Sequence, residues 1–511
     1  MKTSHASRAL ASAAAPCRWL ALGALALPLA GCMVGPDYVR PGAATGDAYK
    51  EAGDWKPAQP SDEADRGRWW KIFGDADLDA LEEQVDVSNQ NVVAARAQYL
   101  QARALVQQAR AAFWPTLDLS PSVTRAKQSD TLGSRPVAHG AYTSYVVPLN
   151  VSWELDLWGG ARRASEGAQA SAQASAADVE AILLASRAEL AQDYLQMRAL
   201  DAQKRLLEET AVAYERSLQM TRNRYANGVA SRADVAQAET QLRTTQAQAT
   251  DVGVQRAQLE HAIAVLTGKP PSQLSLPANP LAGDPPLTPV GLPSSLLERR
   301  PDVAAAERRV AAANAQIGVA TAAYFPTLSL GIQGGFESAD LSQLFTAPSR
   351  FWSIGPVLAQ KVFDAGLRRA RTAQARAAYE GSVASYRQTV LTSLQEVEDN
   401  LAALRILEQE AQTQELAVGA AEQSVTLTTN QYKAGVVSYL DVVTAQSVAL
   451  SNRRAAVDIR GRRMVASVLL VKALGGGWDA GQLPDAKALA SSDPSSTSPP
   501  TASASPSTTR Q

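Results

Sequence analysis

Cysteine, histidine and methionine are scarce in this chain of 511 residues, which has two Cys, three His and five Met. Cys17 lies in the N-terminal leader described below, so a disulfide or a cysteine metal site is excluded. Only His139 and His261 lie outside that leader, and neither has a nucleophile motif or metal-ligand spacing beside it. We therefore predict that the protein is not an enzyme. So few thioethers also disfavour a relay for Cu(I).

The sequence also lacks an apolar run long enough for a transmembrane helix. Its longest one, Trp19 to Ala30, follows three basic residues and is too short to span a bilayer, which is typical of a secretory signal peptide. The run ends in Leu29-Ala-Gly-Cys32, which resembles the bacterial lipobox. We predict that residues 1–31 are removed and that Cys32 carries diacylglycerol and a fatty acyl chain. Met33, in the position where an Asp would retain a lipoprotein in the inner membrane, favours the outer membrane.

A strong net charge is missing as well. The chain has 49 basic and 50 acidic residues, and removal of the leader takes away Lys2, Arg8 and Arg18. This leaves 46 basic against 50 acidic residues, a net charge of −4. Such a balance excludes a strongly basic nucleic-acid binder. We predict no nucleic-acid partner, no metal and no cofactor other than the acyl groups.

What the sequence does have is a turn motif that occurs twice. Arg224-Tyr-Ala-Asn-Gly-Val-Ala-Ser-Arg-Ala-Asp-Val235 returns 207 residues later as Gln431-Tyr-Lys-Ala-Gly-Val-Val-Ser-Tyr-Leu-Asp-Val442. Each copy has a glycine to end one helix, a serine to cap the next, and an acid three residues after the serine. These residues are Gly228, Ser231 and Asp234 in the first copy and Gly435, Ser438 and Asp441 in the second. Each copy thus predicts the tip of a long helical hairpin, in a fold of two structural repeats.

Between the helical segments, apolar residues no longer recur at helical spacing but alternate with polar residues. The clearest case is 146–157, where apolar residues alternate with Asn, Ser, Glu and Asp. We predict four strands, at 115–127, 143–157, 327–337 and 351–363. Their length approaches the roughly 9–11 residues that cross a bilayer. Aromatic residues mark the helix-side ends, as at a membrane interface: Phe113, Trp114, Trp158, Tyr324, Phe325 and Phe363. A soluble antiparallel sheet with one wet face is the alternative.

The lengths of the segments limit the architecture. A helix over 161–227 would reach about 100 Å and needs partners along its whole length. The expected helices at 78–112 and 232–266, placed end to end, have the same total length as the long helix. We therefore expect a cylinder in which long helices alternate with stacked pairs of short helices. Four strands cannot close a hollow barrel, whereas three chains supply twelve. The predicted fold class is an α+β membrane protein with a trimeric 12-stranded outer-membrane β-barrel continuous with a periplasmic α-helical barrel.

We predict six segments along the chain. They are the signal peptide 1–31, a lipidated extended segment 32–74, the first repeat 75–276, a Pro-rich linker 277–296, the second repeat 297–475, and an equatorial, disordered Ser/Pro-rich tail 476–511. The extended segment, the linker and the tail would form a belt at mid-height.

These features together resemble the TolC-like outer-membrane factors, in particular the lipoprotein branch that serves resistance-nodulation-division (RND) multidrug pumps. The resemblance covers the chain from Cys32 to Leu474 and includes both tips. It also includes Cys32-Met-Val-Gly-Pro-Asp-Tyr38, Trp69-Trp70 with Phe73, Leu266-Thr-Gly-Lys-Pro-Pro271 and Arg300-Pro-Asp-Val303. It implies a homotrimer in the outer membrane that passes drugs outward from an RND pump and a periplasmic adaptor. The alternatives are the conduit of a type I protein secretion system and a purely structural coiled-coil lipoprotein, which would not explain the strands.

The resemblance further implies a gate at the periplasmic tips, where carboxylates, a tyrosine and apolar residues close the tunnel. By motif, the gate residues are Asp234, Tyr432, Tyr439, Leu440 and Asp441. The chain differs from TolC in Val437, where an Arg tethers the closed state, and in Thr444, where a second Asp stands. The competing interpretation is that Asp234 and Asp441 only cap helices.

Overall fold

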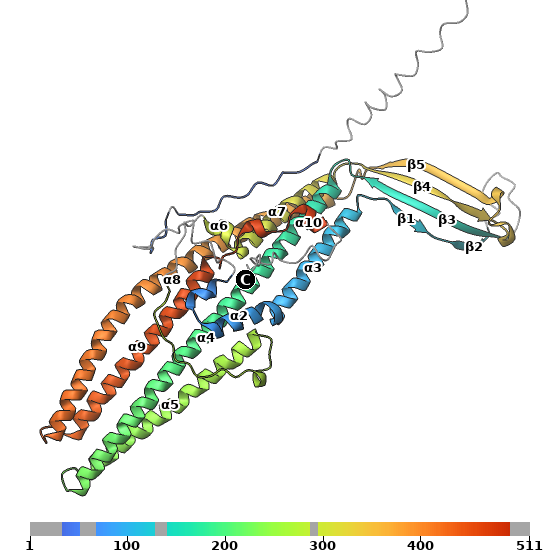
Figure 1. Ribbon diagram of the computed structural model, residues 1–511. Helices are drawn as coiled ribbons and strands as arrows, with labels where there is room; N and C mark the ends of the chain where they lie inside the picture. The colour runs from blue at the N-terminus through green and yellow to red at the C-terminus, as the bar shows by residue number, and fades with distance from the viewer. Residues whose placement is uncertain (1–32, 47, 52–67, 128–140, 287–294, 491–511) are drawn as a thin grey trace, which may run out of the picture.

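The computed structural model describes residues 33–46, 48–51, 68–127, 141–286 and 295–490. The predicted signal peptide, the predicted acylation site Cys32 and residues 491–511 of the predicted tail 476–511 lie outside them. Residues 476–490 of that tail are described and include the short helix α10 (Ala486–Ala490). The molecule is elongated, with a β-sheet at one end and two helical hairpins that point toward the other (Figure 1). None of the helices in the described ranges is long and apolar enough to cross a membrane.

Two very long helices form the frame of the molecule. Each has 67 residues, which confirms the prediction of long helical hairpins. The helices are α2 (Ala76–Ser88), α3 (Gln90–Ala111), α4 (Gly160–Ala226), α5 (Arg232–Leu266), α6 (Leu296–Arg299), α7 (Pro301–Ala322), α8 (Leu367–Lys433), α9 (Tyr439–Ala473) and α10 (Ala486–Ala490). The first hairpin is α4 with α5, the second is α8 with α9, and α4 packs against α9 to join them.

Each long helix lies beside a stacked pair of short ones, as the segment lengths predict. At the junction of the first pair, the Asn89 side-chain amide donates to the carbonyl of Leu266, the last residue of α5, at 2.9 Å. At the second junction, Arg300 donates to the carbonyl of Ala473, the last residue of α9, at 3.0 Å. Both junctions therefore satisfy a carbonyl that the end of a helix leaves without a partner.

A glycine at each junction allows this close approach. Gly268 has φ +71° and Gly475 has φ +95°, a region that other residues rarely adopt. A Cβ on Gly475 would lie 2.1 Å from the carbonyl oxygen of Arg299. The stacked arrangement therefore depends on glycine at these two positions.

The single helix expected at 78–112 is in fact two helices. Asn89 breaks it, because its side-chain oxygen accepts from the backbone N–H groups of Asn91 and Val92 and so caps α3. The same side chain donates to α5, as described above, so the break and the stacking have one cause.

The largest apolar cluster lies at mid-height. Trp70 is 1% exposed and packs among residues of α2, α4, α5 and α9, including Leu78, Tyr194, Ile263 and Val468. Trp69 and Trp70 belong to a short 3-10 helix, Trp69–Phe73, within the segment that the sequence predicts to be extended. The buried indoles hold this segment against α4.

The sheet contains β1 (Thr116–Leu119), β2 (Ser122–Ala126), β3 (Tyr142–Leu155), β4 (Thr327–Ser338) and β5 (Arg350–Ala359), in the order β1-β3-β4-β5 with β2 also paired to β3. All pairs are antiparallel. The strand expected at 115–127 is interrupted at Pro121, which has no N–H for the ladder. The strand expected at 351–363 ends at Ala359, because its partner Thr327 is the first residue of β4.

The register gives the sheet one apolar and one polar face. Residues paired directly across β1, β3, β4 and β5 form rows that alternate between the two faces. An apolar row consists of Leu117, Val151, Ile332 and Ile354, and the adjacent polar row consists of Asp118, Asn150, Gln333 and Ser353. Much of the apolar row is exposed in the single chain. Such a face needs lipid or a partner to cover it.

Candidate gate at the helical tips

Both tips have the backbone geometry that ends a helix at a glycine. Gly228 and Gly435 have φ of +71° and +79°. In the first tip, Gly228 N donates to the Tyr225 carbonyl and Val229 N to the Arg224 carbonyl, both at 2.9 Å. The second tip repeats these two bonds from Gly435 and Val436. The chain therefore reverses in the same way in both copies.

The two acids of the tips cap the returning helices. Asp234 accepts from the backbone N–H of Ser231 at 2.9 Å, and the Ser231 hydroxyl accepts from the backbone of Asp234 at 3.1 Å. Asp441 accepts from the backbone N–H of Ser438 at 3.0 Å and from its hydroxyl at 2.7 Å. Each carboxylate thus has a local structural role within its own chain.

The two tyrosines of the second tip pack it against the first hairpin. Tyr432 of α8 and Tyr439 of α9 meet edge to face, with ring centroids 5.3 Å apart. Both are buried, and they share a cluster with Leu218 of α4 and Leu242 of α5. Hydrogen bonds join Tyr439 to Ser217 and Thr221, and burial raises the pKa of its hydroxyl. The tyrosines are therefore contacts between the hairpins.

Of the other residues considered at the second tip, Leu440 and Thr444 lie outside this contact and Val437 lies at its edge. Leu440 is 54% exposed. Thr444 donates to the Leu440 carbonyl of its own helix at 2.9 Å, and Val437 packs at the edge of the tyrosine cluster. The fold brings Tyr432 and Tyr439 together and leaves Leu440 on the surface.

Sequence reasoning missed Arg224. Its guanidinium carbon lies 4.8 Å from the centroid of the Tyr432 ring, and its Nη1 donates to the Lys433 carbonyl at 3.3 Å. A comparison of the two copies of the motif could have drawn attention to Arg224, because the second copy has the uncharged Gln431 at the equivalent position.

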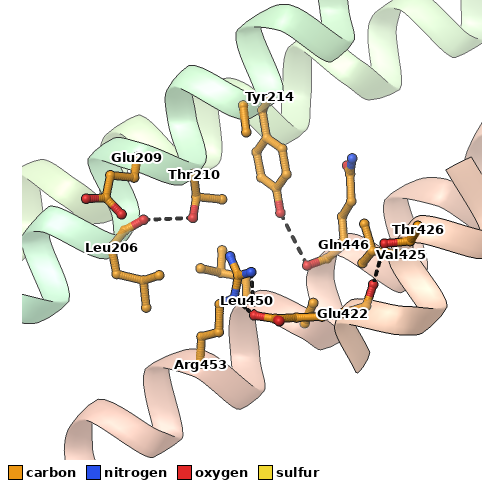
Figure 2. A pocket seen from close by; sticks show the side chains of 12 residues that line it. Leu206, Glu209, Thr210, Tyr214, Glu422, Val425, Thr426, Gln446, Leu450 and Arg453 are labelled. Carbon is orange, nitrogen blue, oxygen red and sulfur yellow. Dashed lines mark hydrogen bonds and ion pairs between the residues drawn. The ribbon is translucent and has the colours of Figure 1, made fainter. Parts of the chain in front are cut away.

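A cavity of about 350 Å³ separates the hairpins next to the tyrosine cluster (Figure 2). On the α4 side the Tyr214 hydroxyl donates to the Gln446 carbonyl of α9 at 3.3 Å. On the other side Arg453 of α9 pairs with Glu422 of α8 at 2.5 Å, within the second hairpin. The cavity interrupts the packing between the hairpins, and the tyrosine cluster is the contact beside it.

The aromatic residues predicted at the membrane interface lie where the sheet meets the helices. Trp158 stacks on Phe325 with ring centroids 4.7 Å apart and donates to the Pro326 carbonyl at 2.7 Å. The indole of Trp153 donates to the carbonyl of Phe113 at 3.0 Å. Tyr324 lies beneath the guanidinium of Arg368, while Trp114 and Phe363 are 74% and 86% exposed. Exposed aromatics at the far end of the sheet were not predicted: Tyr142, Phe345 and Trp352.

The first described residues after Cys32 are fixed at this same level. Val34 N donates to the Trp158 carbonyl at 3.1 Å, and Met33 lies against Gly159. Arg163, 1% exposed, pairs with Asp37 at 2.7 Å. The chain that follows the predicted acylation site is therefore held beside the aromatic residues.

Among the described residues, no group of three His, Cys, Asp or Glu side chains could hold a metal ion. His261 lies on α5, and His139 lies outside the described ranges.

Comparisons with known proteins place these features in a family. Residues 81–269 and 292–476 match the model of the outer membrane efflux protein family. The antibiotic efflux pump outer membrane protein ArpC of Pseudomonas putida is 32% identical over 462 residues, which cover 90% of this chain and 95% of ArpC. The solvent efflux pump outer membrane protein SrpC of Pseudomonas putida is 34% identical over 469 residues, covering 89% and 97%. The structure of the outer-membrane channel OprN superposes with a TM-score of 0.81 at 30% identity and covers 88% of this chain and 100% of OprN.

Proposed function

Because the chain belongs to the outer membrane efflux protein family, we propose that it is the outer-membrane channel of a tripartite efflux system. It passes antibiotics and other toxic small molecules outward from an inner-membrane RND pump and a periplasmic adaptor. The observation that carries this proposal is the two-faced sheet, apolar on one side and polar on the other, joined directly to long helical hairpins. An apolar face toward lipid and a polar face toward water are what a membrane barrel requires.

Three copies of the chain form the channel in this proposal. The strands β1, β2 and β5 have an unpaired edge in the single chain, and such edges are not tolerated in lipid. Exposed apolar side chains also follow one side of α8, where a neighbouring copy would cover them: Leu391, Ile406, Leu416 and Leu427. Three copies would close twelve strand positions into a barrel and surround a tunnel with their helices.

The protein is anchored in the outer membrane by its barrel and by the acyl groups on Cys32. The contacts of Met33 with Gly159 and of Val34 with Trp158 support this arrangement, because acyl chains on the preceding residue would start at the membrane interface.

The periplasmic tips close the tunnel in this proposal. In a trimer, three copies of Asp234, Leu440 and Asp441 would surround one axis, while Tyr432 and Tyr439 hold each second hairpin to its first. Carboxylates gathered in this way repel one another, so divalent cations would favour the closed tip.

The test is single-channel recording in planar bilayers with protein whose mass is measured by light scattering. A trimer that conducts, and whose conductance falls when Mg²⁺ is added on the periplasmic side, is the expected result. A monomer without channel activity would refute the proposal. Deletion of the gene should increase susceptibility to antibiotics and solvents. Unchanged susceptibility with loss of an exported protein would instead indicate the conduit of a type I secretion system.

A further inference from the structure

The two copies of the tip motif have diverged at the positions where they meet. Tyr225 and Tyr432 are equivalent in the repeat, yet Tyr225 is 48% exposed and Tyr432 is 6% exposed. Arg224, which precedes the exposed tyrosine, has Gln431 as its equivalent. At these two positions the first copy therefore has a cation and an exposed ring, whereas the second has a neutral amide and a buried ring.

These differences meet in one contact between the hairpins. Arg224 lies in the last turn of α4, and its guanidinium reaches the last turn of α8. There it faces the Tyr432 ring at 4.8 Å and donates to the Lys433 carbonyl at 3.3 Å. The carbonyls of a last helical turn have no partner within the helix and carry the negative end of its dipole. One side chain thus combines a cation–π contact, a charge-assisted hydrogen bond and a favourable interaction with the helix dipole.

The same contact leaves two polar groups dehydrated. Neither Nε of Arg224 nor the hydroxyl of Tyr432 has a hydrogen-bond partner among the residues that the structure describes, and both atoms are buried. Separation of the tips would return both groups to water, which opposes the attraction. The contact is therefore suited to hold the tips together without locking them permanently.

We propose that Arg224 is the latch of the gate, holding the tip of the second hairpin closed against the first within each chain. Tyr432 serves this latch through the face of its ring and not through its hydroxyl. This inference rests on the proposed channel function and adds the residue that sets how readily the channel opens. Tyr439 also joins the two hairpins near the tips, through hydrogen bonds to Ser217 and Thr221 of α4, but it does not contact the end of α8 through a cation. The hydrogen bonds from Tyr214 to Gln446 and from Gln241 to Ser447 lie farther along the helices from the turns.

The test compares the open probability of Arg224→Gln with that of the wild type in planar bilayers. Glutamine is the residue that the second repeat carries at this position, so the helix should tolerate it. The variant loses the attraction between Arg224 and the end of α8, and part of that loss is offset because the closed tip no longer buries an unpaired Nε. The net effect should raise the open probability about tenfold. Arg224→Lys keeps a cation and should give a smaller rise. Cells with Arg224→Gln should also admit more vancomycin.

Arg222→Ala is the matched control. Arg222 lies two residues earlier on α4 and pairs with Glu239 at 3.6 Å, within the first hairpin. Removal of this ion pair should leave the open probability at the wild-type value. An Arg222 variant that opens the channel as much as Arg224→Gln would overturn the latch, because any weakening of the tip would then suffice.

Two variants of Tyr432 test the partner of Arg224 in the contact. They test the proposal even if Arg224→Gln does not fold. Tyr432→Phe keeps the ring and removes a hydroxyl that only separated tips hydrate, so its open probability should be at or below the wild-type value. Tyr432→Leu should raise the open probability, and adding Arg224→Gln to it should raise it by less than Arg224→Gln does alone. Wild-type gating in Tyr432→Leu would overturn the latch while leaving the channel function intact. The absence of channel activity in the wild type itself would overturn the proposed function, and the latch with it.

Discussion

Glu82 offers a prediction about how the stability of this protein depends on pH. Its side chain lies in α2 with no exposed surface, and neither carboxyl oxygen has a hydrogen-bond partner in the described part of the chain. Burial raises the pKa of Glu82 to about 9, the nearby Asp79 adds to the rise, and Arg187 opposes it. At neutral pH the folded protein therefore holds a proton on Glu82 that the unfolded chain releases.

The sign of the effect follows from this difference. Because the folded-state pKa is above the unfolded value of 4.5, the contribution of Glu82 is fully present below pH 4.5 and is lost as the pH rises toward 9. Within this window the free energy of unfolding should fall by about 1.4 kcal/mol per pH unit, which amounts to about 3 kcal/mol at pH 7. Glu82→Gln replaces the protonated acid with a neutral group of the same shape and should remove this dependence.

Thermal unfolding followed by circular dichroism between pH 5 and pH 8 measures the effect. The wild type and Glu82→Gln should unfold at similar temperatures at pH 5, and the variant should become progressively more stable than the wild type as the pH rises. Glu83→Gln is the control, because Glu83 is an exposed neighbour that pairs with Arg68 at 3.3 Å. If Glu82→Gln is less stable than the wild type at pH 8, Glu82 is ionised in the folded protein and the reasoning is wrong.

Three further predictions concern the helix junction, the tip and the anchor. Gly475→Ala should prevent the stacking of α7 on α9 and sharply reduce the yield of folded protein, because its Cβ would lie 2.1 Å from the Arg299 carbonyl oxygen. The control is Gly419→Ala, in an open part of α8, which should leave the yield and the melting temperature at or slightly above the wild-type values. Asp441→Ala removes the acid of a capping box and should cost about 0.3–1 kcal/mol of stability, measured as a lower melting temperature. If it also relieves the Mg²⁺ block of conductance, Asp441 belongs to the gate, and if the block persists, it is only a helix cap. Cys32→Ser should no longer incorporate labelled palmitate yet keep part of the efflux activity, and label that persists in this variant would refute acylation at Cys32.

The sequence by itself determined the features that depend on neighbouring residues. The caps at Ser231 and Ser438 join residues three apart, so their spacing in the sequence is sufficient to predict them. Alternation along 146–157 assigned each side chain to a face, because the direction of side chains along a strand has a period of two. The near match between α4, with 67 residues, and the helices stacked beside it, with 13, 22 and 35, can likewise be predicted from residue counts because every helical residue adds the same rise.

Only the tertiary structure decided which distant residues meet. The contact of Asn89 with the end of α5 spans 177 residues, and the contact of Arg224 with the end of α8 spans 209 residues. The helical spacing of Glu82 from Leu78 and Val85 places it on their face of α2, but its complete burial depends on the helices that pack over that face. Local patterns fix helices, caps and faces because those interactions lie within a few residues, whereas the stacking junctions, the latch and the buried acid arise from packing between segments that the sequence leaves far apart.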